Sequence, residues 1–140
     1  MLTVHAYSFG VPNPLLDITE AEFQSTVIDF AKRCSWSVWH IPDSRMQAGG
    51  KLVGARMAAG LPDLLLVHRA HGFVLAELKR EKGKVRPAQV KALEKMAEAA
   101  IPAAMTACKV RVHLWRPSDM DSVVVPLLRS GTGPTVYGVQ

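Results

Sequence analysis

Two carboxylates and a lysine stand at the ends of neighbouring apolar runs. Asp63 follows Pro62 and opens the first run, and Glu77, fourteen residues after Asp63, closes the second run together with Lys79. Side chains alternate between the faces of a strand, so Glu77 and Lys79 point the same way, and a hairpin would place Asp63 beside them. Such carboxylates can hold Mg²⁺ or Mn²⁺ against a phosphodiester and lower the pKa of a bound water, while the lysine offsets transition-state charge. The trio predicts a metal-dependent nuclease.

Each of these residues also has a simpler interpretation. Asp63 could be an ordinary turn residue, because aspartate is common in turns after proline, and Lys79 could be an exposed lysine at a sheet edge. Glu77 interrupts an apolar strand, where an uncompensated carboxylate is costly, so it needs a cation. That cation is either Lys79, in an ordinary ion pair, or a metal. The three residues together favour the metal.

Two further polar residues border the core-facing stripes of predicted helices. Glu20 lies three residues before Phe23 and seven before Val27, and Gln89 lies four residues before Leu93. Glu20 is either a carboxylate that complements the helix dipole or a further acidic group of the metal site. Gln89 is either an ordinary polar residue of a first helical turn or a residue that reaches the active edge. The spacing alone does not separate these alternatives.

The net charge of +5 and the pI of about 9.5 suggest a polyanionic partner. Basic residues concentrate in a turn after Lys79, which is either a solvated turn or a phosphate-binding edge. Others lie in the glycine-rich loop 43–60, where Leu52 follows Gly50-Lys51 and excludes a P-loop. Beside a metal site we favour DNA binding, with Arg45, Lys51, Arg56, Arg80, Lys82, Lys84 and Arg86 as the candidate contacts.

The elements that must position these residues predict one α/β domain over residues 1–140, with a mixed central sheet flanked by helices. A capping box of Thr19 and Glu22 starts the first helix, and Pro87 starts the second, which Ile101-Pro102 should end. The predicted core spans about residues 19–128, and tails 1–16 and 130–140 are expected to be irregular. The expected strands are Trp36–Ile41, Asp63–His68, Phe73–Lys79 and Val110–Trp115, and an apolar element follows at Val123–Leu128.

Other classes of protein are disfavoured. No apolar run is long enough to span a bilayer, and the N-terminus does not resemble a secretion signal, so a cytoplasmic location is expected. The cysteines, Cys34 and Cys108, are expected to be free buried thiols. The histidines lack zinc-ligand spacing, and His40 is expected to be a semi-buried structural residue. The tryptophans are expected to pack in the core or on strands; they are Trp36, Trp39 and Trp115.

Taken together, these motifs resemble the VRR-NUC (virus-type replication-repair nuclease) family of the PD-(D/E)xK nuclease superfamily. The resemblance runs from about Thr19 to Leu128. It is carried by the strings Gly60-Leu61-Pro62-Asp63-Leu64, Ala76-Glu77-Leu78-Lys79 and Gly83-Lys84 with Gln89, by Thr19 to Gln24 in the opening helix, and by the closing segment Trp115 to Asp119.

The resemblance implies a restriction-endonuclease-like core and a role for each matching residue. Asp63, Glu77 and the carbonyl of Leu78 would be metal ligands, with Glu20 as the acidic residue of the first helix. Lys79 would be the catalytic lysine, and Gln89 the glutamine of the second helix.

The resemblance also implies a homodimer of a phage or bacterium that cuts branched DNA such as Holliday junctions. A flap- or end-acting nuclease and an inactive DNA-binding module of the same fold are alternatives. The most conservative reading is a basic interaction protein with a salt bridge at a sheet edge. Val123–Leu128 is an apolar candidate for the dimer contact, and core packing explains this segment equally well.

Overall fold

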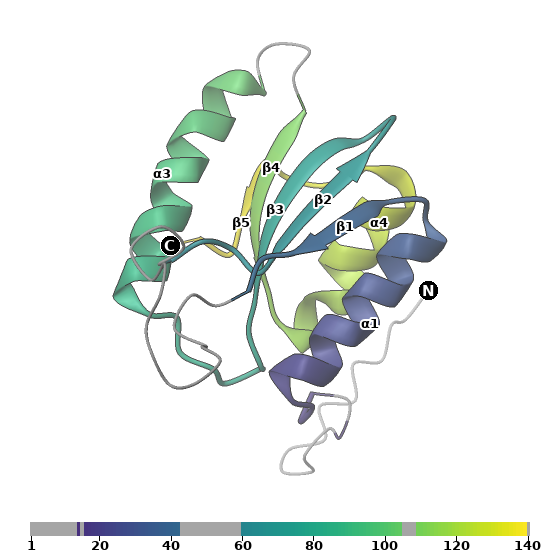
Figure 1. The fold of residues 1–140 in the computed structure, drawn as a ribbon, viewed down its shortest axis with the longest axis vertical. Helices are drawn as coiled ribbons and strands as arrows, with labels where there is room; N and C mark the ends of the chain where they lie inside the picture. The colour runs from purple at the N-terminus through teal and green to yellow at the C-terminus, as the bar shows by residue number, and fades with distance from the viewer. Residues whose placement is uncertain (1–13, 15, 43–59, 105–108, 140) are drawn as a thin grey trace, which may run out of the picture.

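The computed structural model describes residues 14, 16–42, 60–104 and 109–139, and these form a mixed sheet covered by helices on both faces (Figure 1). The strands are β1 (Ser37–His40), β2 (Leu64–His68), β3 (Gly72–Leu78), β4 (Val110–Trp115) and β5 (Val136–Tyr137). The helices are α1 (Glu20–Arg33), α3 (Pro87–Ala103) and α4 (Val125–Ser130), and short 3₁₀ and π turns, Pro117–Asp119 and Met120–Val124, precede α4.

The five strands lie in the order β1-β2-β3-β4-β5. The pairs β1–β2 and β2–β3 are antiparallel, and β3–β4 and β4–β5 are parallel. Leu64 pairs with Ala76, so the start of β2 lies beside the end of β3, as the predicted hairpin requires. A parallel neighbour needs a crossover connection, which α3 supplies between β3 and β4. The sheet therefore places Asp63 next to Glu77 and starts α3 at the same edge.

The first helix begins where the sequence predicts. The Thr19 hydroxyl accepts a hydrogen bond from the Glu22 backbone N–H at 3.1 Å, and the Glu22 carboxylate accepts one from the Thr19 N–H at 2.8 Å. The apolar stripe predicted for this helix is confirmed, because its residues Phe23, Val27 and Ala31 are buried against the sheet. This cap fixes the register of the first turn of α1 and hence the direction in which Glu20 projects.

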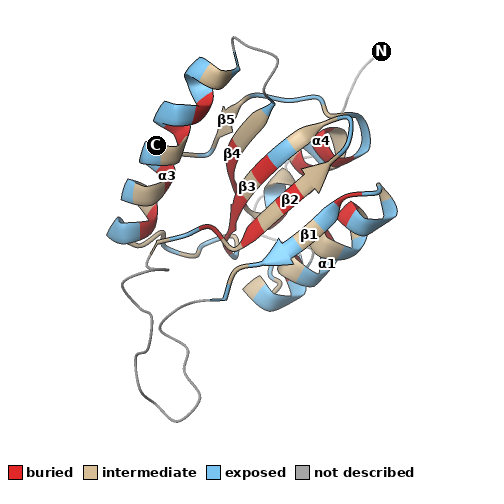
Figure 2. Ribbon diagram, turned by 45° about the horizontal axis from the view of Figure 1, so that its top comes forward, coloured by how far each residue is buried: buried red, intermediate tan, exposed pale blue. Residues whose placement is uncertain are grey.

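The core has a layer on each face of the sheet (Figure 2). On one face α1 and α4 pack against alternate residues of β2 and β3, and on the other α3 packs against β4. The indole N–H of Trp36 donates to the Leu128 carbonyl at 2.8 Å, which ties the α1–β1 connection to α4. Val124, Leu127 and Leu128 are buried in this layer, so core packing accounts for them. None of the described helices is long and apolar enough to cross a membrane.

Several local expectations are wrong. The tail is not irregular throughout, because Val136 and Tyr137 pair with β4 and the Thr135 carbonyl accepts from Val112 N–H at 2.8 Å. The added strand satisfies backbone groups along the outer edge of β4.

The second helix also departs from its predicted end, since α3 continues through Pro102 to Ala103. A proline in a last turn removes only one intrahelical hydrogen bond, and Ala104 N–H still donates to the Ala100 carbonyl at 3.0 Å. Trp39 is 54% exposed rather than packed, because no described helix covers it on the edge strand β1. Of the cysteines, Cys34 is free and half-buried, and Cys108 lies outside the described residues.

Gly60 brings the chain against the first turn of α3. Its φ is +82°, and a Cβ there would lie 2.4 Å from the Ala88 carbonyl oxygen. We expect Gly60→Ala to lower the free energy of unfolding by more than about 2 kcal/mol, through left-handed strain and a backbone clash. Gly133→Ala is the matched control, since Gly133 also has a positive φ but a Cβ there meets nothing within 4 Å. Equal losses in urea unfolding of the two variants would contradict the close approach.

Candidate active site

The predicted site residues come together around one open cavity of about 740 Å³. The cavity is bordered by the start of α1, the end of β1, the start of β2, the end of β3 and the start of α3. Its lining includes four of the five predicted catalytic residues, and Glu77 lies directly behind them in contact with Lys79 and Gln89. The lining residues are Glu20, Ala21, Gln24, His40, Pro42, Asp63, Lys79, Lys84, Arg86 and Gln89.

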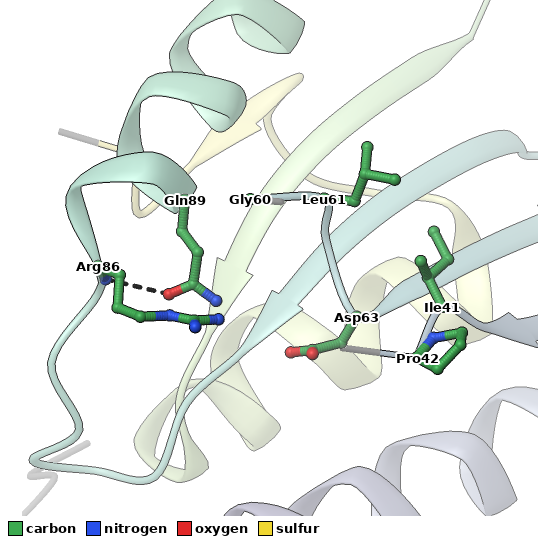
Figure 3. A pocket seen from close by; sticks show the side chains of 7 residues that line it. All are labelled: Ile41, Pro42, Gly60, Leu61, Asp63, Arg86 and Gln89. Atoms are coloured by element: carbon green, nitrogen blue, oxygen red, sulfur yellow. Dashed lines mark hydrogen bonds between the residues drawn. The ribbon is translucent and has the colours of Figure 1, made fainter. Parts of the chain in front are cut away.

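Asp63 is fixed at the junction of loop and strand. Its Oδ2 accepts a hydrogen bond from Leu78 N–H at 2.8 Å, and its carbonyl accepts one from Ile41 N–H at 2.7 Å. The carboxylate points across the end of the sheet toward Gln89 and Arg86, which approach from the α3 side (Figure 3). Asp63 is half-buried, so its carboxylate is both held in place and open to the cavity.

Glu77 is a buried carboxyl group with one oxygen that no described residue satisfies. Its Oε1 accepts a hydrogen bond from the Gln89 amide at 2.6 Å and lies 3.2 Å from the ammonium of Lys79. Its Oε2 is buried and has no hydrogen-bond partner within the part of the chain that the structure describes. Burial, and secondly the charge of Asp63, raise the pKa of Glu77 to about 8, although Lys79 acts in the opposite direction.

The pKa of Asp63 is raised as well, chiefly because the group is desolvated. Its hydrogen bond from Leu78 N–H and the charges of Lys79 and His40 oppose that shift. Two neighbouring carboxyl groups with raised pKa values do not both ionise readily, because the charge of one disfavours the charge of the other. Without a cation between them, Asp63 and Glu77 therefore form a pair that retains a proton near neutral pH.

Lys79 lies between acidic groups from different elements. Its Nζ is 3.2 Å from Glu77 Oε1 and 3.9 Å from Glu20 Oε2, and the residue is 7% exposed. Its backbone N–H donates to the Trp115 carbonyl at 3.0 Å, which continues the β3–β4 pairing by one residue. Lys79 is therefore fixed at the cavity wall both through its backbone N–H and through its ammonium.

The donor set fits a hard divalent metal that takes few side-chain ligands. Asp63 and Glu77 repel one another, and Glu77 Oε2 lacks a partner among the described residues, so a cation between them would relieve both conditions. Among the described residues, no three His, Cys, Asp or Glu side chains are arranged to hold a metal. Glu20 instead contacts Lys79, so the structure does not group it with the other carboxylates as a third ligand. Mg²⁺ commonly retains several waters beside one or two carboxylates, which matches this pair.

His40 is a residue of the site that sequence reasoning missed. It was expected to be a semi-buried structural residue, but it is exposed at the end of β1 and lines the cavity beside Asp63. Its charge lowers the pKa of Asp63. The antiparallel register pairs His40 with Leu64, directly after Asp63, so a prediction of which strand β1 joins would have located it.

The candidate DNA contacts are distributed unevenly around this cavity. Lys84 and Arg86 line it, and Arg80 and Lys82 are exposed on the turn that follows Lys79. The remaining candidates, Arg45, Lys51 and Arg56, lie outside the described residues.

No family model matches the sequence, and comparisons with curated proteins and with solved structures found no match.

Proposed function

We propose that this protein is a metal-dependent DNA endonuclease of the PD-(D/E)xK type, similar to the VRR-NUC family. The observation that carries the proposal is the buried Glu77, set between Asp63 and Lys79 behind an open cavity with basic residues on its wall. Its Oε2 has no partner among residues 16–42, 60–104 and 109–139. The mixed sheet flanked by helices is the architecture that the sequence resemblance implies.

A purely structural ion pair explains the site less well. Glu77 and Lys79 are within ion-pair distance, yet both are buried, and one oxygen of Glu77 is left unsatisfied by the residues that the structure describes. A buried ion pair that serves stability alone offsets its desolvation only when the remaining lone pairs are also bonded. Unsatisfied groups of this kind and strongly raised pKa values gather at functional sites. The site retains a competent side chain at each proposed position, which also favours an enzyme over an inactive DNA-binding module.

Each residue has a distinct task in the proposed reaction. Asp63 and Glu77 would hold Mg²⁺ or Mn²⁺, which when bound supplies Lewis-acid polarisation of the phosphoryl oxygen and a more acidic water. Lys79 donates hydrogen bonds to the attacking water or to a phosphoryl oxygen as charge develops there. Gln89 fixes the rotamer of Glu77, and Glu20 helps to hold the ammonium of Lys79.

The proposed substrate is DNA, bound through its phosphates by the cations beside the cavity. A preference for branched DNA and a homodimeric assembly that cuts paired strands rest on the sequence resemblance. Flap or end cleavage is the alternative within the same chemistry.

The test is cleavage of a labelled four-way junction, a flap and a plain duplex, each with Mg²⁺, with Mn²⁺ or with EDTA. We expect paired, metal-dependent incisions on the junction. Cleavage confined to flaps or free ends would replace the junction preference with the end-acting alternative. Tight binding without cleavage in either metal would leave the inactive DNA-binding module. Affinity that does not fall with rising salt would contradict phosphate binding.

Gln89→Met should weaken both metal binding and cleavage. The variant removes the amide that donates to Glu77 Oε1, so the pKa of Glu77 rises further and its carboxylate is less well oriented. Loss of a residue that hydrogen-bonds to a metal ligand typically costs about 10–100-fold in metal affinity or activity. Titration of cleavage rate against Mg²⁺ at pH 7 and pH 9 measures the effect, with recovery expected at the higher pH. Lys91→Met, on the exposed face of α3, is the control, and an unchanged Mg²⁺ dependence in Gln89→Met would contradict this role.

A further inference from the structure

A single guanidinium holds the backbone of the basic turn, defined here as residues 80–86. Nη1 of Arg116 donates to the carbonyl oxygens of Arg80 at 2.9 Å, Glu81 at 3.0 Å and Gly83 at 2.8 Å. Gly83 N–H also donates to the Arg80 carbonyl at 2.9 Å, which closes the turn on itself. The turn therefore curls around a cation that comes from the end of β4.

A second contact joins the same two segments. The Glu81 carboxylate accepts a hydrogen bond from Ser118 N–H at 2.9 Å. Arg116 is itself fixed, because its backbone N–H donates to the Asp119 carboxylate at 2.8 Å and the Tyr137 hydroxyl of β5 donates to that carboxylate. A continuous set of hydrogen bonds thus runs from β5 through Asp119 and Arg116 to the basic turn.

The same segment also fixes Lys79. The residue before Arg116 is Trp115, whose carbonyl accepts the Lys79 N–H at 3.0 Å. Trp115 and Arg116 therefore hold the proposed catalytic lysine and the turn that follows it as one unit. The contacts that Arg116 makes with the turn are to backbone carbonyls, and the side chains of Arg80 and Lys82 stay exposed and available to an anion.

We infer that Arg116 is a positioning residue for DNA, which holds the basic turn in its phosphate-binding conformation relative to Lys79. The inference rests on the proposed nuclease function and assigns a determinant of substrate affinity within it. A turn that is ordered before binding does not lose that conformational entropy when DNA binds, which strengthens the complex. Charge-assisted hydrogen bonds to several carbonyls give more order than neutral ones would.

The experiment compares Arg116→Met and Arg116→Lys with Arg111→Met. Arg111 is a matched control because its guanidinium also donates to turn carbonyls, those of His71 and Gly131, at the far end of the same strand. Two measurements are made: hydrogen exchange of the amides of residues 81–85 in protein free of DNA and metal, and KM and kcat for junction DNA with the salt dependence of KM. The lysine variant keeps the charge and should recover part of the effect.

For Arg116→Met we expect exchange of the turn amides to rise about tenfold or more. We also expect KM to rise about tenfold, with kcat within about threefold of the wild type, because the lost contact orders the turn before DNA binds. Arg111→Met should change neither quantity, even if its thermal stability falls as much.

Two outcomes would overturn the inference. If exchange of the turn amides is unchanged in Arg116→Met, Arg116 does not order the turn. If exchange is faster but KM is unchanged, the order that Arg116 gives the turn has no role in DNA binding. A wild-type protein that neither binds nor cuts DNA would refute the proposed function, and the role in DNA binding with it, while the exchange measurement would still decide whether Arg116 orders the turn.

Discussion

Lys79→Met should reduce cleavage of DNA by about 10²–10³-fold, the usual cost of removing a donor that stabilises transition-state charge. Methionine provides an unbranched apolar side chain of similar length that lacks the ammonium. Affinity for uncleaved DNA in EDTA should change little, because the ammonium lies at the buried wall of the cavity and contacts Glu77 and Glu20. Single-turnover cleavage and filter binding measure the two quantities separately.

Lys82→Met is the matched control, since Lys82 is exposed on the basic turn. That variant should weaken DNA binding and its salt dependence, with near-normal cleavage once DNA is saturating. If Lys79→Met cuts saturating DNA at the wild-type rate, the lysine has no part in the chemistry. In that event its contact with Glu77 would be a structural ion pair only.

Glu77→Gln should abolish the stabilisation of the protein by Mg²⁺ and flatten its pH dependence. The folded-state pKa of Glu77 is raised to about 8 from 4.5, so at intermediate pH the folded protein keeps a proton that the unfolded chain has lost. In metal-free buffer the Glu77 contribution to the free energy of unfolding therefore declines as pH rises from about 4.5 to about 8. At 1.36 kcal/mol per pKa unit the full decline is on the order of a few kcal/mol. The raised pKa of Asp63 adds a contribution of the same sign.

Another buried group sets the best pH window for this measurement. Burial lowers the pKa of His113 to about 4, so its contribution to stability rises with pH up to its ordinary value of 6.5 and opposes that of Glu77. Between pH 6.5 and pH 8 the decline from Glu77 is no longer opposed by His113. Metal binding needs the ionised carboxylate, so the rise in Tm caused by Mg²⁺ should grow across this window.

Thermal unfolding at pH 6.5, 7.25 and 8, with and without Mg²⁺, tests both the decline in stability with pH and the rise in Tm caused by Mg²⁺. Glu98→Gln on the exposed face of α3 is the control and should behave like the wild type. A Mg²⁺-dependent rise in Tm that survives in Glu77→Gln would place the metal elsewhere. A wild-type stability that does not decline over this window would contradict the raised pKa of Glu77.

The features that were predictable from the sequence are those set by neighbours along the chain. The Thr19 capping box, the boundaries of Val110–Trp115 and the shared direction of Glu77 and Lys79 follow from local hydrogen bonding and from strand alternation. The spacing of Gln89 before Leu93 left open whether this residue reaches the site, and the structure places its amide against Glu77.

The features that escaped prediction depend on pairing between distant segments. His40 enters the site through the β1–β2 register, and Arg116 reaches a turn more than thirty residues earlier in the chain. The strand Val136–Tyr137 has too short an apolar pattern to be recognised without β4 beside it. In each case the local pattern permits several partners, and only the folded sheet selects one.

The parallel pairing of β3 with β4 bears on when the site forms during folding. Asp63 and Glu77 meet within an antiparallel hairpin, which closes over a short stretch of chain. Lys79 and the basic turn contact Trp115 and Arg116 only after β4 has paired with β3. That pairing closes the longer loop between residues 79 and 110, so its entropic cost is larger than that of the hairpin. A nascent chain that has not yet released β4 from the ribosome thus has its carboxylates in place and lacks the strand that secures the lysine. The ordering of the lysine and the basic turn is in this way deferred until β4 has been synthesised and has paired with β3.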